Sequence, residues 1–191
     1  MNIEFDLEKN FDQYIINKLS KHNKTDYQVE TIKKDGIIDI VMYPLDYFNF
    51  NHRNILFGIE SKILNHFYFK EKELKIKDQL DFFIQSLKYS QRKFYNNRDV
   101  FVFAPNIFTN QYLHNHNYDK NYYSIKDEKS HKLMRSILSY FGLGSWEFAN
   151  NELYLFFKSE LIYDTKNGYT KLAYNKKDFF LDKKQFNKAL K

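Results

Sequence analysis

The sequence contains no cysteine, which excludes disulfide bonds, thiolate metal sites, iron–sulfur clusters and cysteine nucleophiles. Glycine and proline are scarce, at 5 and 2 of 191 residues, and neither a glycine-rich phosphate loop nor a serine nucleophile elbow is found. No stretch approaches the ~20 consecutive apolar residues that a membrane-spanning helix needs. The N-terminal MNIEFDLEKNF is broken by charges, unlike a secretory signal. We therefore expect a cytoplasmic protein with no membrane partner.

Arginine is rare but lysine is abundant. The chain has 26 lysines and 4 arginines against 24 acidic residues, a formal net charge of +6 that favours a polyanionic partner. It is also rich in asparagine, isoleucine, phenylalanine and tyrosine, as AT-biased genomes encode, so the basicity and the 19% aromatic content carry little functional information. The length, with 43% hydrophobic and 28% charged residues, indicates one folded domain with a continuous core.

The hydrophobic pattern predicts an α/β domain whose elements follow the order α, β, β, β, α, β. The expected helices cover residues 6–21 and 76–93, and the expected strands cover residues 27–33, 36–43, 55–64 and 99–104. The second and third strands are apolar on both faces, which is typical of central strands covered on both sides. We therefore expect a central mixed sheet flanked by helices.

The second half of the sequence is patterned more weakly. Residues 106–126 are polar and predict a loop, and residues 130–141 predict a helix. Short strands are expected at residues 146–148, 152–158, 161–163 and 169–174. The Asn167-Gly168 pair indicates a hairpin between the last two. We divide the chain into a core of residues 1–105 and a C-terminal helix and strand extension of residues 106–191 that packs on the same domain.

Three charged residues interrupt the apolar strands. Asp39 lies within IIDIV, and Glu60 and Lys62 lie within FGIESKI. Because burying an isolated carboxylate is costly, a cation or a partner must neutralise these carboxylates. Strand alternation places Glu60 and Lys62 on one face, and Asp39 reaches the same place if the two strands are neighbours. A buried salt bridge in an unrelated α/β domain is the alternative explanation.

Two carboxylates and a lysine at one end of a sheet suit the metal-dependent hydrolysis of a phosphodiester. Carboxylate oxygens hold a hard divalent ion such as Mg²⁺, and the ion neutralises charge that develops on the phosphate. A lysine ammonium orients the attacking water or helps to deprotonate it. Asp39, Glu60 and Lys62 are the candidates for these tasks.

The same residues resemble the PD-(D/E)XK nuclease superfamily, over residues 6–105. Asp39 matches the aspartate that the family carries on its second strand, and Glu60-Ser61-Lys62 matches the tripeptide on its third. The string IESKI followed by Gln79-Leu80 is similar to the branch with IExKI and QL, and GIIDIV is similar to RecB-like members. Ile38 replaces the proline that usually precedes the aspartate.

The resemblance implies a restriction-endonuclease-like fold and a Mg²⁺ or Mn²⁺ cofactor. It implies that Asp39 and Glu60 are metal ligands, together with the backbone carbonyl of Ser61. Lys62 would act on the attacking water. Glu8 on the first helix is a candidate for the outer carboxylate that some members use to bind a second ion, and Asp12 lies on the same side of that helix.

The family's helix motif, Gln-x-x-x-Tyr, has two candidates. The predicted apolar stripe of the helix contains Ile76, Leu80, Phe83, Ile84 and Leu87. At ~100° per residue, Gln79 lies on the flank of this stripe, whereas Gln85 and Tyr89 point almost opposite. We therefore prefer Gln79 as the catalytic glutamine, with Phe83 in place of the tyrosine, although Gln85 and Tyr89 match the letters.

Several residues beside the site are candidates for contact with nucleic acid. Lysines near the expected helix could follow a phosphate backbone, or they could form a solvated face with the glutamates between them. The candidates are Lys70, Lys72, Lys75, Lys77, Gln85 and Tyr89.

The expected function is that of a Mg²⁺-dependent deoxyribonuclease of a phage, restriction, defence or repair type. One alternative is an inactive nucleic-acid-binding or anti-defence module on the same scaffold. Another is an RNA endonuclease, because no residue in the sequence separates DNA from RNA as substrate. A homodimer is a further expectation, because many such nucleases cut duplexes as dimers.

Overall fold

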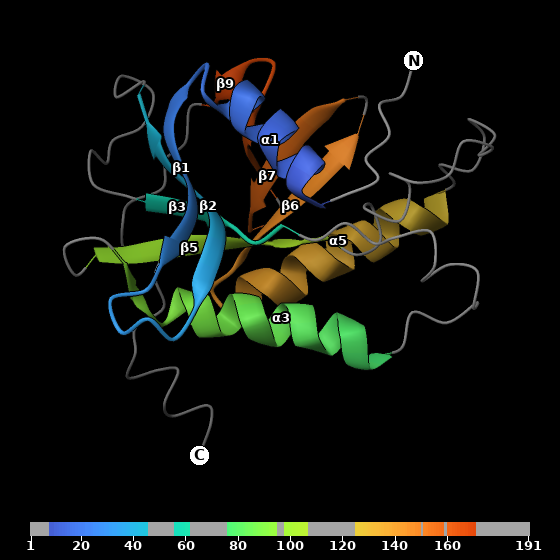
Figure 1. Cartoon of the computed structure of the whole chain (residues 1–191). Helices are drawn as coiled ribbons and strands as arrows, with labels where there is room; N and C mark the ends of the chain where they lie inside the picture. Colours follow the sequence, from blue (N-terminus) through green and yellow to red (C-terminus); the bar gives the residue numbers. More distant parts are fainter. Residues whose placement is uncertain are drawn as a thin grey trace.

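A computed structural model describes residues 8–45, 56–61, 76–94, 98–106, 125–149, 151–158 and 160–170. These residues form a mixed α/β structure, with three helices packed on a curled mixed sheet (Figure 1). None of the described helices combines the length and apolar character needed to cross a bilayer.

The helices are α1 (Glu8–Leu19), α3 (Ile76–Ser90) and α5 (Ile125–Tyr140). The strands of the first half are β1 (Asn23–Glu30), β2 (Ile37–Pro44), β3 (Leu56–Ile59), β4 (Lys93–Phe94) and β5 (Arg98–Pro105). Those of the second half are β6 (Gly144–Ala149), β7 (Glu152–Phe157), β8 (Glu160–Asp164) and β9 (Gly168–Tyr169). The predicted order α, β, β, β, α, β is therefore observed, with the short strand β4 added before β5.

The strands follow the order β1-β2-β3-β5-β6-β7-β8-β9, and β4 pairs with β5. The pairs β3–β5 and β5–β6 are parallel, and the other pairs are antiparallel. Helices α3 and α5 lie in the two parallel connections, as parallel strands require a crossover. The sheet is continuous across residue 105, so the predicted core and extension share it. The carboxyl ends of β3 and β5 consequently lie at one edge, where ligands commonly bind in α/β sheets.

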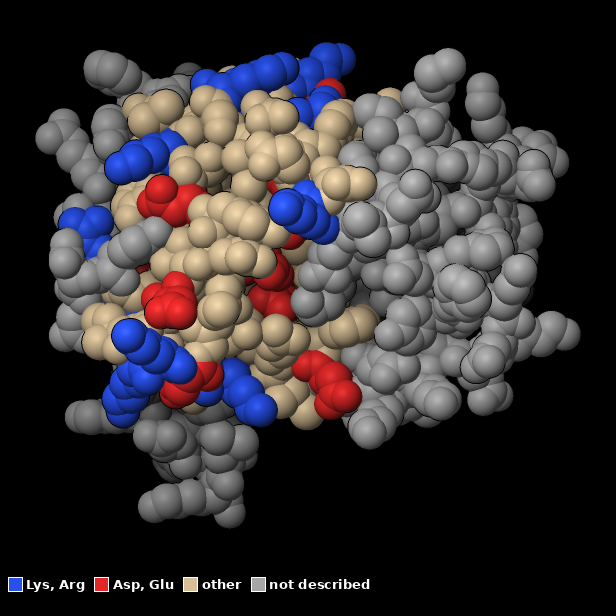
Figure 2. Space-filling model, viewed as in Figure 1, with Lys and Arg blue, Asp and Glu red and all other residues tan. Residues whose placement is uncertain are grey.

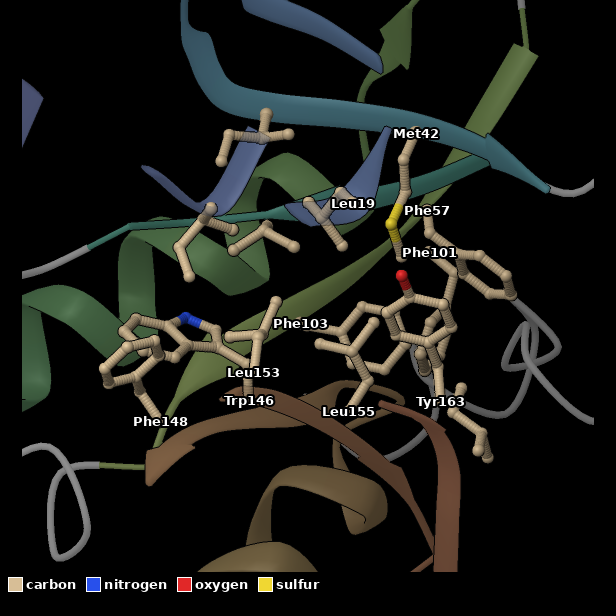
Figure 3. Packing of buried hydrophobic residues seen from close by; sticks show 14 of the residues in the cluster. Leu19, Met42, Phe57, Phe101, Phe103, Trp146, Phe148, Leu153, Leu155 and Tyr163 are labelled. Atoms are coloured by element: carbon tan, nitrogen blue, oxygen red, sulfur yellow. The ribbon is translucent and has the colours of Figure 1, made fainter. Parts of the chain in front are cut away.

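Two apolar clusters cover the two faces of the sheet. The first combines α1 with aromatic residues of β3, β5 and β6, and Figure 3 shows Trp146 in it beside Phe148. The second lies between the sheet and helices α3 and α5, and includes Val41, Val102 and Leu138. Both predicted central strands are thus buried on both faces, as their sequences indicate.

Several element boundaries differ from the predictions. Strand β1 begins at Asn23 rather than at residue 27, because it is the outermost strand beside β2 and many of its side chains face solvent. Strand β3 ends at Ile59, before the predicted end at residue 64, and residues 62–64 lie outside the described part of the structure. Helix α5 begins at Ile125, within the predicted loop, and residues 107–124 of that loop also lie outside the described part.

Candidate functional site

The structure brings Asp39 next to the segment Glu60–Ser61. Strands β2 and β3 are antiparallel neighbours, with Ile40 opposite Ile59. One residue beyond this pair, the Asp39 carboxylate accepts a hydrogen bond from the amide of Ser61, with 2.8 Å between Oδ2 and N. The predicted convergence of Asp39 with the third strand is therefore observed in the described residues.

Glu60 and Ser61 continue the chain after β3 ends, and three neighbouring strands bind their main-chain groups. The Glu60 amide donates to the Phe103 carbonyl on β5 at 3.1 Å. The Glu60 carbonyl accepts a bond of 2.7 Å from the indole Nε1 of Trp146 on β6. The Ser61 amide donates to Asp39 on β2. Three consecutive polar groups of the main chain are thus held by three different strands.

The two carboxylates differ in their exposure to solvent. Glu60 is fully buried, at 0% exposure, and so is Ser61, whereas Asp39 is only half-buried. Burying a carboxylate is costly unless hydrogen bonds or a positive charge compensate for the lost solvation. The half-buried Asp39 leaves one side of the pair accessible from solvent.

Other predicted site residues lie wholly or partly outside the described part of the structure. Lys62, Lys70, Lys72 and Lys75 are outside it entirely. Glu8, Lys77 and Gln79 belong to helices α1 and α3, but their side chains are not described. Their proposed roles stay predictions.

The predicted apolar stripe of α3 is confirmed only in part. Phe83 and Leu87 pack against the second apolar cluster as predicted. Ile84, expected in the core, is 42% exposed, whereas Tyr89, expected on the outer face, is only 8% exposed and belongs to that cluster. The Tyr89 ring lies against Gly36, where an added Cβ would be 2.6 Å from it. Gln85 donates to the Tyr89 hydroxyl at 3.0 Å, so the two residues of the second Gln-x-x-x-Tyr candidate contact each other.

Asp12 lies one helical turn after Glu8 on α1 and is buried. Its side chain is 2% exposed on α1, one residue after Phe11, which packs on Trp146 with 5.6 Å between ring centroids. The described residues do not gather Asp12 with two other acidic side chains, so the structure does not bring it into a metal-binding group.

A buried polar network beyond the carboxyl end of β5 was not predicted from the sequence. Asn106 donates to the Glu147 carboxylate at 2.7 Å, and Arg135 of α5 makes two bonds of 2.6 Å to the same carboxylate. The Arg135 guanidinium also stacks over the Phe156 ring, 3.6 Å from its centroid. The only sequence signal was a glutamate between two aromatic residues in SWEFA, and its partners are distant in the sequence.

The donor set of Asp39, Glu60 and the Ser61 carbonyl is suitable for a hard divalent ion. Mg²⁺ typically binds one or two carboxylates and takes its remaining oxygens from water and phosphate. Among the described residues, no three acidic or imidazole side chains gather into a metal-binding group.

The face of the molecule seen in Figure 2 has charges of both signs. Figure 2 shows lysine and arginine side chains interspersed with acidic ones over the described part of that face.

Comparison with protein-family models, with curated proteins and with solved structures finds no significant match for the chain. The interpretation of the site therefore depends on its own residues and geometry.

Proposed function

We propose that this protein is a Mg²⁺- or Mn²⁺-dependent nuclease that hydrolyses DNA phosphodiester bonds. The observation that carries the proposal is the hydrogen bond from the Ser61 amide to Asp39, which puts a half-buried carboxylate against the Glu60–Ser61 peptide. The order of the first elements, with Asp39 on the second strand and Glu60 after the third, supports a restriction-endonuclease-like core.

Each residue has a separate task in this proposal. Asp39, Glu60 and the carbonyl of Ser61 would hold the ion, which would supply positive charge to stabilise the phosphate as its negative charge develops. Lys62 would orient the water that attacks the phosphorus atom, and a glutamine of α3, either Gln79 or Gln85, would help to position that water. Glu8 of α1 would be the candidate for an outer carboxylate. Glu60 is fully buried, so its carboxylate is shielded from bulk solvent.

A digestion panel tests this function. The purified chain is incubated with linear and covalently closed duplex DNA, single-stranded DNA and RNA, with Mg²⁺ or with a chelator. We expect Mg²⁺-dependent cleavage of DNA that falls at least about 100-fold in Asp39→Asn, because the ion loses a charged ligand. Asp26→Asn is the control, since Asp26 is a half-buried aspartate of the neighbouring strand β1.

The outcomes separate the alternatives. Cleavage that survives in Asp39→Asn contradicts the assignment. Selective cleavage of RNA indicates the RNA endonuclease. Binding that weakens steeply with salt, without cleavage under any condition, indicates an inactive nucleic-acid-binding module.

A further inference from the structure

Trp146 is the only tryptophan of the chain, and it connects the second half of the sequence to the candidate site. It is fully buried on β6, and its indole N–H donates to the carbonyl of Glu60, 86 residues earlier in the chain. A side chain thus binds the main chain at the position that supplies a carboxylate to the site.

Pro105 explains why a side chain is needed there. In the parallel pairing of β3 with β5, Phe103 lies opposite Ile59 and its carbonyl accepts from the Glu60 amide. The same ladder would next have the amide of residue 105 donate to the Glu60 carbonyl. Residue 105 is a proline and has no N–H. The indole N–H of Trp146 takes the place of this missing main-chain donor.

The indole ring is itself held on several sides. Its flat face stacks on Phe11 of α1, and the Trp146 carbonyl accepts from the Asn106 amide at 2.9 Å. The next residue, Glu147, is fixed by Asn106 and Arg135. The network beyond β5 therefore fixes β6 at Trp146 and at the residue that follows it.

We propose that Trp146 is a positioning residue of the metal site. By donating to the Glu60 carbonyl it fixes the Glu60–Ser61 peptide, and so the direction of the Glu60 carboxylate and the Ser61 carbonyl toward a divalent ion. This inference rests on the proposed function. It also gives the C-terminal half of the chain a part in the site that the first half supplies.

The test is a Mn²⁺ titration of the full chain, with the dissociation constant measured by calorimetry and with DNA cleavage measured in parallel. In Trp146→Phe, which keeps an aromatic ring but loses the N–H, we expect the constant to rise about 10–100-fold, as when outer-shell partners of a metal site are removed. We expect kcat to fall similarly while KM for DNA stays unchanged.

Rescue separates positioning from packing. Adding Pro105→Ala to Trp146→Phe supplies a main-chain N–H at the position where the ladder lacks one, so Mn²⁺ affinity should return to within about threefold of wild type. Phe148→Leu loosens the same apolar cluster without removing a bond to Glu60, so its Mn²⁺ affinity should stay at the wild-type value. If Trp146→Phe does not fold, a benzothienyl analogue of tryptophan at position 146 keeps both rings and removes only the N–H.

Three results would overturn the inference. These are wild-type Mn²⁺ affinity in Trp146→Phe, a loss that Pro105→Ala does not restore, or an equal loss in Phe148→Leu. None of these results contradicts the proposed function as long as the wild-type chain binds Mn²⁺ and the Asp39→Asn variant does not. A wild-type chain that binds no Mn²⁺ overturns the proposed function, and the positioning role with it.

Discussion

Asp39 and Trp146 both bind the main chain where β3 leaves the sheet. Buried main-chain N–H and carbonyl groups need hydrogen-bond partners, and here side chains supply two of them. Asp39 has a structural role in addition to its proposed catalytic one. Asparagine at position 39 keeps an oxygen for the Ser61 amide but removes the charge, so Asp39→Asn separates the two roles better than Asp39→Ala.

The hydroxyl of Ser61 gives a prediction at the same scale. It is buried and has no hydrogen-bond partner in the described structure. A buried unpaired hydroxyl costs about 1–3 kcal/mol, so Ser61→Ala should leave the free energy of unfolding unchanged or raise it by about 1 kcal/mol. Cleavage should persist, because the proposed ligand is the main-chain carbonyl.

Urea unfolding checks this, with Thr165→Val as the contrast. The Thr165 hydroxyl accepts from the Leu153 amide at 3.0 Å and donates to Glu152, so its removal should cost about 1–3 kcal/mol. A loss of more than about 1 kcal/mol in Ser61→Ala would contradict the account of that hydroxyl.

At the scale of elements, the sequence predicted the strands of the site but not the contacts between distant ones. The apolar runs around Asp39 and Glu60 could only be central strands, and neighbouring central strands bring these residues together. The contact of Trp146 with Glu60 depends on how β6 pairs with β5 after a helical crossover, which no local pattern encodes. The burial of Tyr89 was missed because the apolar stripe of α3 placed this residue on the opposite face, whereas it packs in the second cluster with Phe83 and Leu87.

The ion pair between Arg135 of α5 and Glu147 of β6 should contribute strongly to stability because it is buried. Arg135→Met leaves the Glu147 carboxylate buried with its strongest partner removed, so the free energy of unfolding should fall by about 3–5 kcal/mol. Lys93→Met is the control, because the Lys93–Asp99 pair is at least 35% exposed and should contribute less than about 1 kcal/mol. Both free energies of unfolding are measured in urea. Equal losses in the two variants would contradict the expectation that the buried Arg135–Glu147 pair contributes more to stability than the exposed Lys93–Asp99 pair.

At the scale of the whole molecule, the sheet curls so that its last strands come back to α1. Lys18 binds Glu152 of β7 at 2.6 Å, and the Tyr14 hydroxyl donates to the Asn151 carbonyl at 3.1 Å. The Tyr169 hydroxyl of β9 donates to Asn23 at the start of β1 at 2.5 Å. These contacts join residues from both ends of the strand order, so they stabilise the curl as a whole.

The Lys18–Glu152 pair makes this stability depend on pH. Burial alone would raise the pKa of Glu152, but hydrogen bonds from Lys18 and Thr165 outweigh it and lower that pKa below 4.5. Burial would lower the pKa of Lys18, but its hydrogen bond to Glu152 outweighs this and raises it above 10.5. The contribution is therefore present at neutral pH, and is lost as pH falls through the pKa of Glu152 or rises through that of Lys18.

Unfolding of wild type and Glu152→Gln across pH checks this sign. The difference in unfolding free energy should be constant between about pH 5 and about pH 10, and should shrink below about pH 4.5. A difference that persists unchanged at pH 3 would show that the pair does not titrate as described.

The central claim is that Asp39 and Glu60–Ser61 form a divalent-cation site that Trp146 contacts. Because the chain has one tryptophan, its ¹H–¹⁵N spectrum contains one indole signal, and this signal reports on the bond to Glu60. We predict that Mg²⁺ shifts the indole signal of wild type in a saturable manner and leaves that of Asp39→Asn unmoved. An indole signal that ignores Mg²⁺ in wild type, or moves equally in Asp39→Asn, would contradict the claim.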